Sequence, residues 1–189
     1  MRLLKKRDML DERLQRTPIT PDDWVLGPRE APITLLEYGD FECPHCAAAR
    51  PVLESLVVEN LDALQLVFRH FPVTTIHPHA LMAAEAAEAS GAQGKFWEMH
   101  DLIFTHQDRL ELVYLRRYAA AVELNMDRFD REMAAHAHLQ AVREDFRRGI
   151  EDGVNGTPTI FINRLRYDGP RDRESILAAI AAQAATGRV

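Results

Sequence analysis

Hydrophobic and polar residues follow two different repeats in the first part of this chain. Mostly apolar runs at 33–39 and 64–70 predict buried strands, and the segment between them, 44–59, carries a single apolar stripe, which predicts a helix. A strand, a helix and a strand in this order form a βαβ unit, whose parallel strands have the helix packed on one face. The pattern therefore predicts an α/β core.

The pattern becomes helical from His79 to about Gly149. Its apolar spacing predicts three helices and two shorter ones, lying around 81–89, 96–103, 112–122, 127–134 and 138–152. The last part of the chain predicts a β-rich run, a strand end with a turn, and an alanine-rich helix, at 158–162, 167–169 and 172–186.

These elements divide the chain into three parts. We predict an N-terminal arm at 1–31 with a short strand at 24–26, a core made of 32–76 together with 154–189, and an all-helical insertion at 77–153. Several prolines in and just after the arm favour extended backbone there.

Composition narrows the classes of protein and partner. With 189 residues and 47% hydrophobic content, the chain can bury one good core and a small second lobe. A net charge of −6 argues against nucleic acid or an anionic membrane as partner. The opening segment 1–16 mixes acidic and basic residues and has no apolar run that could form a signal peptide or a membrane span. We therefore expect a cytoplasmic protein.

The two cysteines of the chain, Cys43 and Cys46, lie at the predicted strand-to-helix turn. The first N–H groups of a helix lack intrahelical partners and carry partial positive charge, so a sulfur placed there is stabilised as the reactive thiolate. Pro44 suits the first helical position, and His45 can place positive charge or a donor near the Cys43 sulfur. We expect Cys43 to be exposed enough to attack a disulfide and Cys46, one turn inside, to resolve the mixed disulfide.

Two acidic residues oppose this trend. Carboxylates at Asp40 and Glu42, close to a developing thiolate, disfavour it. The sequence therefore leaves open whether the pair acts as an oxidant or as a reductant.

Three motifs in order resemble the DsbA-like thiol–disulfide oxidoreductases of the thioredoxin superfamily, over about residues 24–186. They are Cys43-Pro44-His45-Cys46 at the turn, Glu37 six residues before the first cysteine, and Gly156-Thr157-Pro158-Thr159 before the penultimate strand. The resemblance implies a thioredoxin fold with an inserted all-helical domain. It also implies dithiol–disulfide exchange that needs no cofactor.

Glu37 has two interpretations. On an apolar buried strand, an unpaired carboxylate is costly, so it is neutral or hydrogen-bonded, and the resemblance makes it a proton shuttle for Cys46. The alternative is an acid that points outward from an edge strand. We favour the proton shuttle.

Thr157 and Pro158 also have two interpretations. An X–Pro bond in a folded protein is cis only about one time in twenty, so the residues alone favour a trans proline that opens a strand. By resemblance, the pair forms a cis-proline loop beside the cysteines that offers backbone groups to an extended substrate. The Thr157 hydroxyl can then hydrogen-bond near the Cys43 sulfur.

The histidines and aromatic residues call for no cofactor or metal. We expect no metal site, because a structural zinc site needs four ligands and no histidine lies at a recognised ligand spacing. We expect surface or helix-cap positions for most of the histidines, namely His77, His79, His100, His106, His136 and His138. Phe96, Trp97 and Phe104 fit core positions, and Asn163-Arg164 replaces the Asn-Gly that suits a tight hairpin.

The sequence thus predicts a monomeric or weakly dimeric exchanger that acts on thiols or disulfides of proteins or small molecules. A glutathione-linked reductase or isomerase on the same scaffold is one alternative. Another is a non-catalytic binding module, fused to or docking on a partner such as a transporter, in which the cysteines are incidental.

Overall fold

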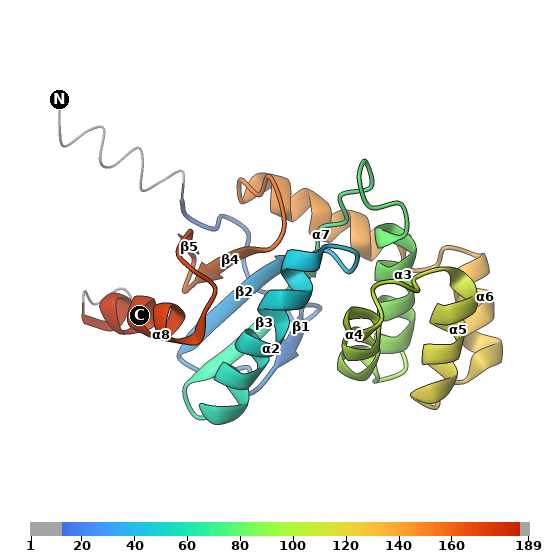
Figure 1. Ribbon diagram of the computed structural model, residues 1–189, viewed down its shortest axis with the longest axis horizontal. Helices are drawn as coiled ribbons and strands as arrows, with labels where there is room; N and C mark the ends of the chain where they lie inside the picture. The colour runs from blue at the N-terminus through green and yellow to red at the C-terminus, as the bar shows by residue number, and fades with distance from the viewer. Residues whose placement is uncertain (1–12, 186–189) are drawn as a thin grey trace.

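The computed structural model describes residues 13–185, and its centre is a five-stranded mixed sheet (Figure 1). The strands lie in the order β1-β3-β2-β4-β5. Their bounds are Trp24–Leu26 for β1, Ile33–Gly39 for β2, Leu64–His70 for β3, Thr159–Ile162 for β4 and Leu165–Tyr167 for β5. Strands β2 and β3 are parallel, as the βαβ pattern predicts, while the other neighbours are antiparallel.

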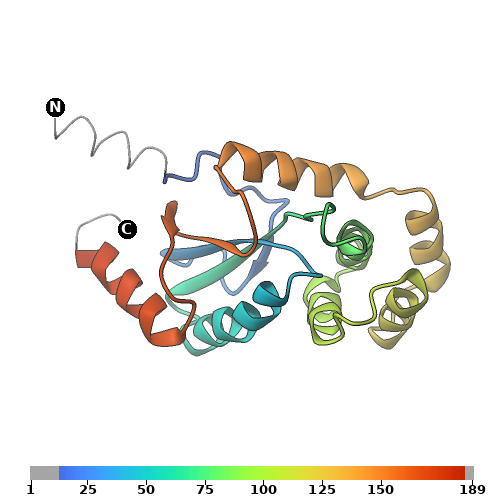
Figure 2. The same ribbon diagram turned by 45° about the horizontal axis from the view of Figure 1, so that its top comes forward.

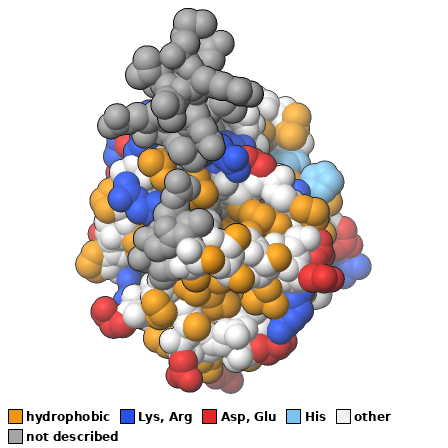
Figure 3. All heavy atoms as spheres, turned by 90° about the vertical axis from the view of Figure 1, so that its left-hand side faces the viewer, with side chains coloured by type: hydrophobic (Ala, Val, Ile, Leu, Met, Phe, Trp, Pro, Cys, Tyr) orange, Lys and Arg blue, Asp and Glu red, His pale blue; other side chains and the backbone are white. Residues whose placement is uncertain are grey.

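Helices cover both faces of this sheet. Helix α2 (Pro44–Glu59) and α8 (Arg173–Ala185) share a hydrophobic cluster with one face of the sheet, and α7 (Leu139–Glu151) lies on the other face. The surface at the α8 end of the molecule mixes acidic, basic and apolar side chains (Figure 3). The predicted α/β class and the predicted order of elements are confirmed.

Four further helices form a bundle beside one end of the sheet (Figures 1 and 2). They are α3 (Ala80–Gly91), α4 (Phe96–Thr105), α5 (Leu112–Ala121) and α6 (Met126–Ala134). Figure 2 shows α7 running from this bundle back over the sheet. The apolar core of the bundle is continuous with both cysteines, so the helical part of the chain reaches the predicted site.

The turn between β4 and β5 shows how the chain manages without Asn-Gly. Asn163 and Arg164 have φ values of 45° and 72°, so both occupy the left-handed region that a two-residue hairpin turn requires. The side-chain carbonyl of Asn163 accepts a 2.8 Å hydrogen bond from the Thr34 N–H, and the Arg164 guanidinium donates to the Gln15 carbonyl at 3.1 Å. These tertiary contacts hold a turn that local preference alone does not favour.

The predicted N-terminal arm is only partly described. Residues 1–12 lie outside the described residues, and those from 13 onward run along the sheet and include strand β1. Among residues 13–185, no helix is both long and apolar enough to cross a membrane.

Candidate active site

The two cysteines lie at the turn between β2 and α2. Cys43 is the N-cap residue of α2, with extended backbone, and Pro44 occupies the first turn of that helix, as expected. The Cys43 carbonyl accepts hydrogen bonds from the N–H groups of Cys46 and Ala47. Both cysteines are free thiols.

Cys43 is more buried than we expected. Its residue surface is 4% exposed and that of Cys46 is fully buried. The loop before β4 approaches Cys43, whose sulfur lies 3.4 Å from the Thr157 carbonyl oxygen, and Gln107 reaches over from the helical bundle. Tertiary contacts from two distant segments therefore cover a turn that looks exposed from sequence.

The two thiols have opposite pKa shifts. A hydrogen bond from Cys46 is the main cause that lowers the pKa of Cys43 to about 5, against the effect of burial, and the Thr157 side chain and the backbone N–H groups of Cys46 and His45 add to it. Burial raises the pKa of Cys46 well above its ordinary value, and the charges of Glu37 and Cys43 raise it further. Because the thiolate is the nucleophile, Cys43 is the reactive sulfur.

His45 acts through its backbone rather than through its ring. The side chain is exposed, and the backbone N–H of His45 is among the groups that lower the pKa of Cys43. The sequence suggests that charge on the His45 imidazole lowers the pKa of Cys43, but this charge is not among the main causes of the shift.

We expected Asp40 and Glu42 to oppose the Cys43 thiolate, but neither is among the main causes of the shift in the Cys43 pKa. The Asp40 carboxylate accepts a hydrogen bond from the Val73 N–H at 2.8 Å and contacts the His77 ring at 2.8 Å. The Glu42 carboxylate accepts from the His79 N–H at 2.7 Å. These carboxylates are engaged by the loop that precedes α3.

Glu37 lies in the interior of the protein, on the central strand β2. This strand has β3 on one side and β4 on the other, and Glu37 is 2% exposed, so the edge-strand interpretation is wrong. Within residues 13–185, no group hydrogen-bonds the Glu37 Oε1 atom. Burial raises the pKa of Glu37 to about 8, with further contributions from the charges of Glu54 and Cys43.

The loop before β4 lies directly against the cysteine pair. The peptide bond between Thr157 and Pro158 is cis, and the Thr157 carbonyl faces the Cys43 sulfur. On the other side of the loop, Arg171 donates a 3.1 Å hydrogen bond to the Pro158 carbonyl. The same Arg171 lowers the pKa of Glu37, so this loop and the buried acid share one cation.

Gln107 is a site residue that sequence reasoning misses. It follows α4, and its side-chain amide donates to the Phe41 carbonyl at 2.7 Å and to the Cys43 carbonyl at 2.9 Å. It therefore ties the helical bundle to the active-site turn. A single glutamine in a loop carries no sequence signal for this role.

The surface interpretation of the histidines is wrong for His100, which is 1% exposed and packs within an aromatic cluster. Four other histidines contact acids far from them in sequence or across a turn, in the pairs His77–Asp40, His79–Glu42, His136–Glu85 and His138–Glu132. Sequence spacing alone does not reveal these pairs. The core positions expected for Phe96 and Phe104 are confirmed, whereas Trp97 is partly buried and packs against the core.

Two clusters bring three potential metal ligands together, Glu54–His100–Asp101 and His70–Glu88–Asp145. In the first, the Arg50 guanidinium lies 3.0 Å from Asp101 and 3.5 Å from Glu54, so a cation is already provided. In the second, the His70 Nε2 atom lies 2.9 Å from the Glu88 carboxylate, so this nitrogen is already engaged.

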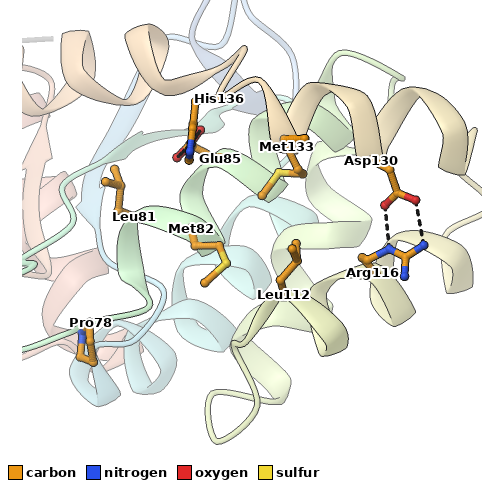
Figure 4. Close-up of a pocket in the computed structure, with 10 residues that line it drawn as sticks. Pro78, Leu81, Met82, Glu85, Leu112, Arg116, Asp130, Met133 and His136 are labelled. Carbon is orange, nitrogen blue, oxygen red and sulfur yellow. Dashed lines mark hydrogen bonds and ion pairs between the residues drawn. The ribbon is translucent and has the colours of Figure 1, made fainter.

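A groove of about 670 Å³ lies on the helical bundle, between α3, α5 and α6 (Figure 4). Leu81, Met82, Leu112 and Met133 line it, and the ion pairs Glu85–His136 and Arg116–Asp130 lie at its rim. Pro78, at one end of the groove, directly precedes His79, whose N–H donates to the Glu42 carboxylate.

The fold and the site define a thioredoxin-fold protein with an asymmetric cysteine pair at the start of a helix. The family described as Thioredoxin matches residues 19–182, and the chain belongs to this family. A thioredoxin-like oxidoreductase from Silicibacter pomeroyi is 25% identical with a TM-score of 0.77, and the match covers 88% of this chain and 94% of that one.

Two further solved structures share the fold. BdbD from Bacillus subtilis is 21% identical with a TM-score of 0.78, covering 90% of this chain and 97% of that one. Alpha-DsbA1 from Wolbachia pipientis is 23% identical with a TM-score of 0.76, covering 90% and 94%. The predicted thioredoxin fold with an inserted helical domain is confirmed, and the chain has the DsbA-like form of that fold.

Among curated relatives, the chain matches only part of longer proteins. The Na(+)/H(+) antiporter NhaA 3 of Salinispora tropica is 45% identical over 173 residues, which are 91% of this chain and 26% of the antiporter. The Na(+)/H(+) antiporter NhaA 1 of Mycolicibacterium vanbaalenii is 42% identical over 168 residues, which are 87% and 27%. The chain thus spans about a quarter of the length of these relatives.

Proposed function

We propose that this protein is a thiol–disulfide oxidoreductase that acts on thiols or disulfides of polypeptides, with small-molecule disulfides as further substrates. Cys43 attacks the substrate disulfide and Cys46 resolves the mixed disulfide. Glu37 exchanges a proton with Cys46. Thr157 and Pro158 offer backbone groups to the substrate beside Cys43.

The observation that carries this proposal is the contrast between the two thiols. A pKa of about 5 makes Cys43 a thiolate at neutral pH, whereas the pKa of the fully buried Cys46 is raised, so Cys46 stays protonated until it is needed. One sulfur that is ionised at neutral pH and a second that is held protonated match the roles of attacking and resolving thiol. The resemblance to a thioredoxin-like oxidoreductase supports the same chemistry.

The resolving step balances without a cofactor. Formation of the mixed disulfide removes the Cys43 charge that helps to raise the pKa of Glu37, which favours the ionised carboxylate. Cys46 loses its proton to ionised Glu37, and the Cys46 thiolate attacks the Cys43 sulfur. The bond between Cys43 and the substrate sulfur breaks, the Cys43–Cys46 bond forms, and the substrate leaves as a thiolate. Run in reverse, the same steps oxidise a substrate dithiol.

Replacing the resolving thiol tests the assignment. Cys46→Ser should leave a long-lived mixed disulfide between Cys43 and a substrate such as reducible insulin, because nothing attacks Cys43 from within. Cys43→Ser should give no such adduct. Mass spectrometry of the trapped species measures both, and trapping by Cys43→Ser instead of Cys46→Ser contradicts the assignment.

A second candidate function comes from the curated relatives, in which the matched region is part of a Na(+)/H(+) antiporter. In this alternative the domain is a binding module attached to a transporter, and its cysteines are incidental. A module of this kind should neither reduce insulin nor oxidise a dithiol. Activity of the wild-type domain in either assay, lost in Cys43→Ser, therefore favours the oxidoreductase.

A further inference from the structure

Glu37 needs a route for its proton. In each resolving step it receives the proton of Cys46, yet it is 2% exposed and lies on the central strand. A buried acid that accepts a proton once per cycle must give it up again before the next cycle, because the Cys43–Cys46 disulfide leaves no enzyme thiol to take it back. The groups packed around Glu37 therefore decide how fast the site resets.

Aromatic side chains lie between Glu37 on β2 and helix α4. The β2–β3 register places Phe68 directly beside Glu37. The Phe68 ring lies 4.9 Å from the His100 ring, measured between centroids, and His100 Nδ1 lies 3.6 Å from Glu54 Oε1. Glu54 thus lies on the same side of the sheet as Glu37, on α2, the helix that begins at the cysteine pair.

Each acid has one carboxylate oxygen that makes no hydrogen bond within residues 13–185. Glu37 Oε1 and Glu54 Oε1 are buried atoms with no hydrogen-bond partner among residues 13–185. Buried polar atoms are almost always satisfied, and an exception calls for water or a functional reason. Two such oxygens on neighbouring elements leave positions at which a proton or a bridging water can be held.

Glu54 also reaches the surface, which Glu37 does not. Its side chain is 20% exposed, and it shares a cluster with Asp101, whose side chain is 51% exposed. Burial, followed by the charge of Asp101, raises the pKa of Glu54 to about 7, so Glu54 can gain and lose a proton near neutral pH.

We propose that Glu54 is the positioning residue that relays protons between Glu37 and solvent. The inference rests on the proposed function and adds a residue to the same site. After Cys46 gives its proton to Glu37, Glu54 accepts it, directly or through one water, and passes it on at Asp101. During disulfide opening the proton runs the other way.

The surrounding charges are compatible with this role. The groups that face Glu54 are Arg50 on its own helix, His100 and Asp101 on α4, and Glu37 on β2. Burial lowers the pKa of His100, so its ring is neutral near pH 7 and leaves the carboxylates to carry the proton. Arg50 provides a permanent positive charge beside Glu54, and Arg171 provides one near Glu37.

The test follows the two steps of exchange separately. Reduced protein is mixed with a small aromatic disulfide whose thiol is coloured, so that attack by Cys43 releases one equivalent and resolution by Cys46 releases the second. Glu54→Gln keeps the size of the side chain and removes its titration. We expect the first phase to be unchanged and the second to slow about tenfold near pH 7, less than the ~10²–10⁴-fold of direct acid–base catalysis because Glu37 remains.

Controls separate proton transfer from packing. Glu59→Gln makes the same change on the exposed end of α2 and should alter neither phase. Glu54→Asp keeps a titrating acid and should recover most of the second-phase rate. The second phase of the wild type should depend on a group that ionises near pH 7, and Glu54→Gln should lose that dependence.

The outcomes distinguish this inference from the proposed function. If both phases occur in the wild type but Glu54→Gln leaves the rate and pH profile of the second unchanged, the relay is wrong and the function stands. Slowing of both phases together, or no recovery in Glu54→Asp, shows a packing role and also overturns the relay. A wild type that releases neither equivalent contradicts the proposed function itself.

Discussion

Buried charge is arranged differently on the two faces of the central sheet. On the α7 face, Arg69 is fully buried and uses all five guanidinium donors, which bond to Asp23, Thr17, Tyr38 and the Pro18 carbonyl. On the α2 face, Glu37 of the neighbouring strand β2 is nearly as buried, and one of its carboxylate oxygens has no hydrogen-bond partner among residues 13–185.

The comparison separates a structural use of buried charge from a chemical one. Burial alone would raise the pKa of Asp23, but the hydrogen bond and charge of Arg69 hold it below its ordinary value, so this pair stays ionised. Burial of Glu37 is opposed only by the charge of Arg171, the smallest of the main causes, and its pKa rises to about 8. The paired cluster fixes the arm against the sheet, whereas the unpaired acid can titrate beside a thiol.

The largest effect should come from breaking the paired cluster. Arg69→Met removes the cation but keeps much of the volume, and it takes from the buried carboxylates of Asp23 and Asp152 the guanidinium that contacts both. Arg148, 3.6 Å from Asp23, remains as a nearby cation. Removing one member of a buried ion pair typically costs about 3–5 kcal/mol. We expect a loss of that size in the free energy of unfolding, measured by chemical denaturation.

An exposed arginine serves as its control. Arg147 on α7 contacts Glu144 and Glu151 at the surface, where such pairs contribute at most about 1 kcal/mol. Arg147→Met should therefore cost far less than Arg69→Met. Equal losses would show that the buried cluster is not special.

A smaller effect should appear in the pH dependence of stability. Since the pKa of Glu37 is about 8 when folded and near 4.5 when unfolded, folding takes up a proton, and the free energy of unfolding falls as pH rises between those values. At about 1.4 kcal/mol per unit, Glu37→Gln should remove roughly 3 kcal/mol of this decline between pH 5 and pH 8. Denaturation of both proteins across this range measures it, and parallel curves would contradict it.

The smallest effect concerns Thr157, whose side-chain hydrogen bond lowers the pKa of Cys43. Thr157→Val keeps the branched shape and loses a hydrogen bond to charge, worth about 1.5–3 kcal/mol at most. The reduced form is then less stabilised, so the potential should become more reducing by a few tens of millivolts, at about 30 mV per 1.4 kcal/mol. Equilibration with glutathione measures it, and an unmoved potential shows that Thr157 does not donate to the thiolate.

Much of the fold is predictable from sequence because its elements have regular patterns. Strands β2 and β3, helix α2 and the helices of the bundle all carry apolar repeats of the expected period, and the CxxC spacing locates the turn. The burial of Glu37 depends instead on the order of the strands in the sheet, because β4, which comes from the far end of the chain, pairs with β2. Local pattern does not contain that information.

The remaining features of the site depend on long-range contacts. The Thr157 carbonyl and Gln107 approach Cys43 from distant segments. The motif around Thr157 and Pro158 predicts the first approach by resemblance, whereas the sequence gives no signal for the second. The Asp40 carboxylate, which the sequence predicts to oppose the thiolate, contacts the His77 ring at 2.8 Å. Residue types identify the thiol chemistry of this site, whereas tertiary contacts decide whether a neighbouring group raises or lowers the pKa of Cys43.

The most direct test of the account is the ionisation of both thiols within the intact reduced protein. Cysteine labelled with ¹³C at Cβ allows NMR to follow Cys43 and Cys46 separately through a pH titration, without a substitution that removes their mutual hydrogen bond. We expect Cys43 to titrate at about pH 5 and Cys46 to remain protonated beyond pH 9. Two thiols that ionise together near pH 9, or a Cys46 that ionises first, would contradict it.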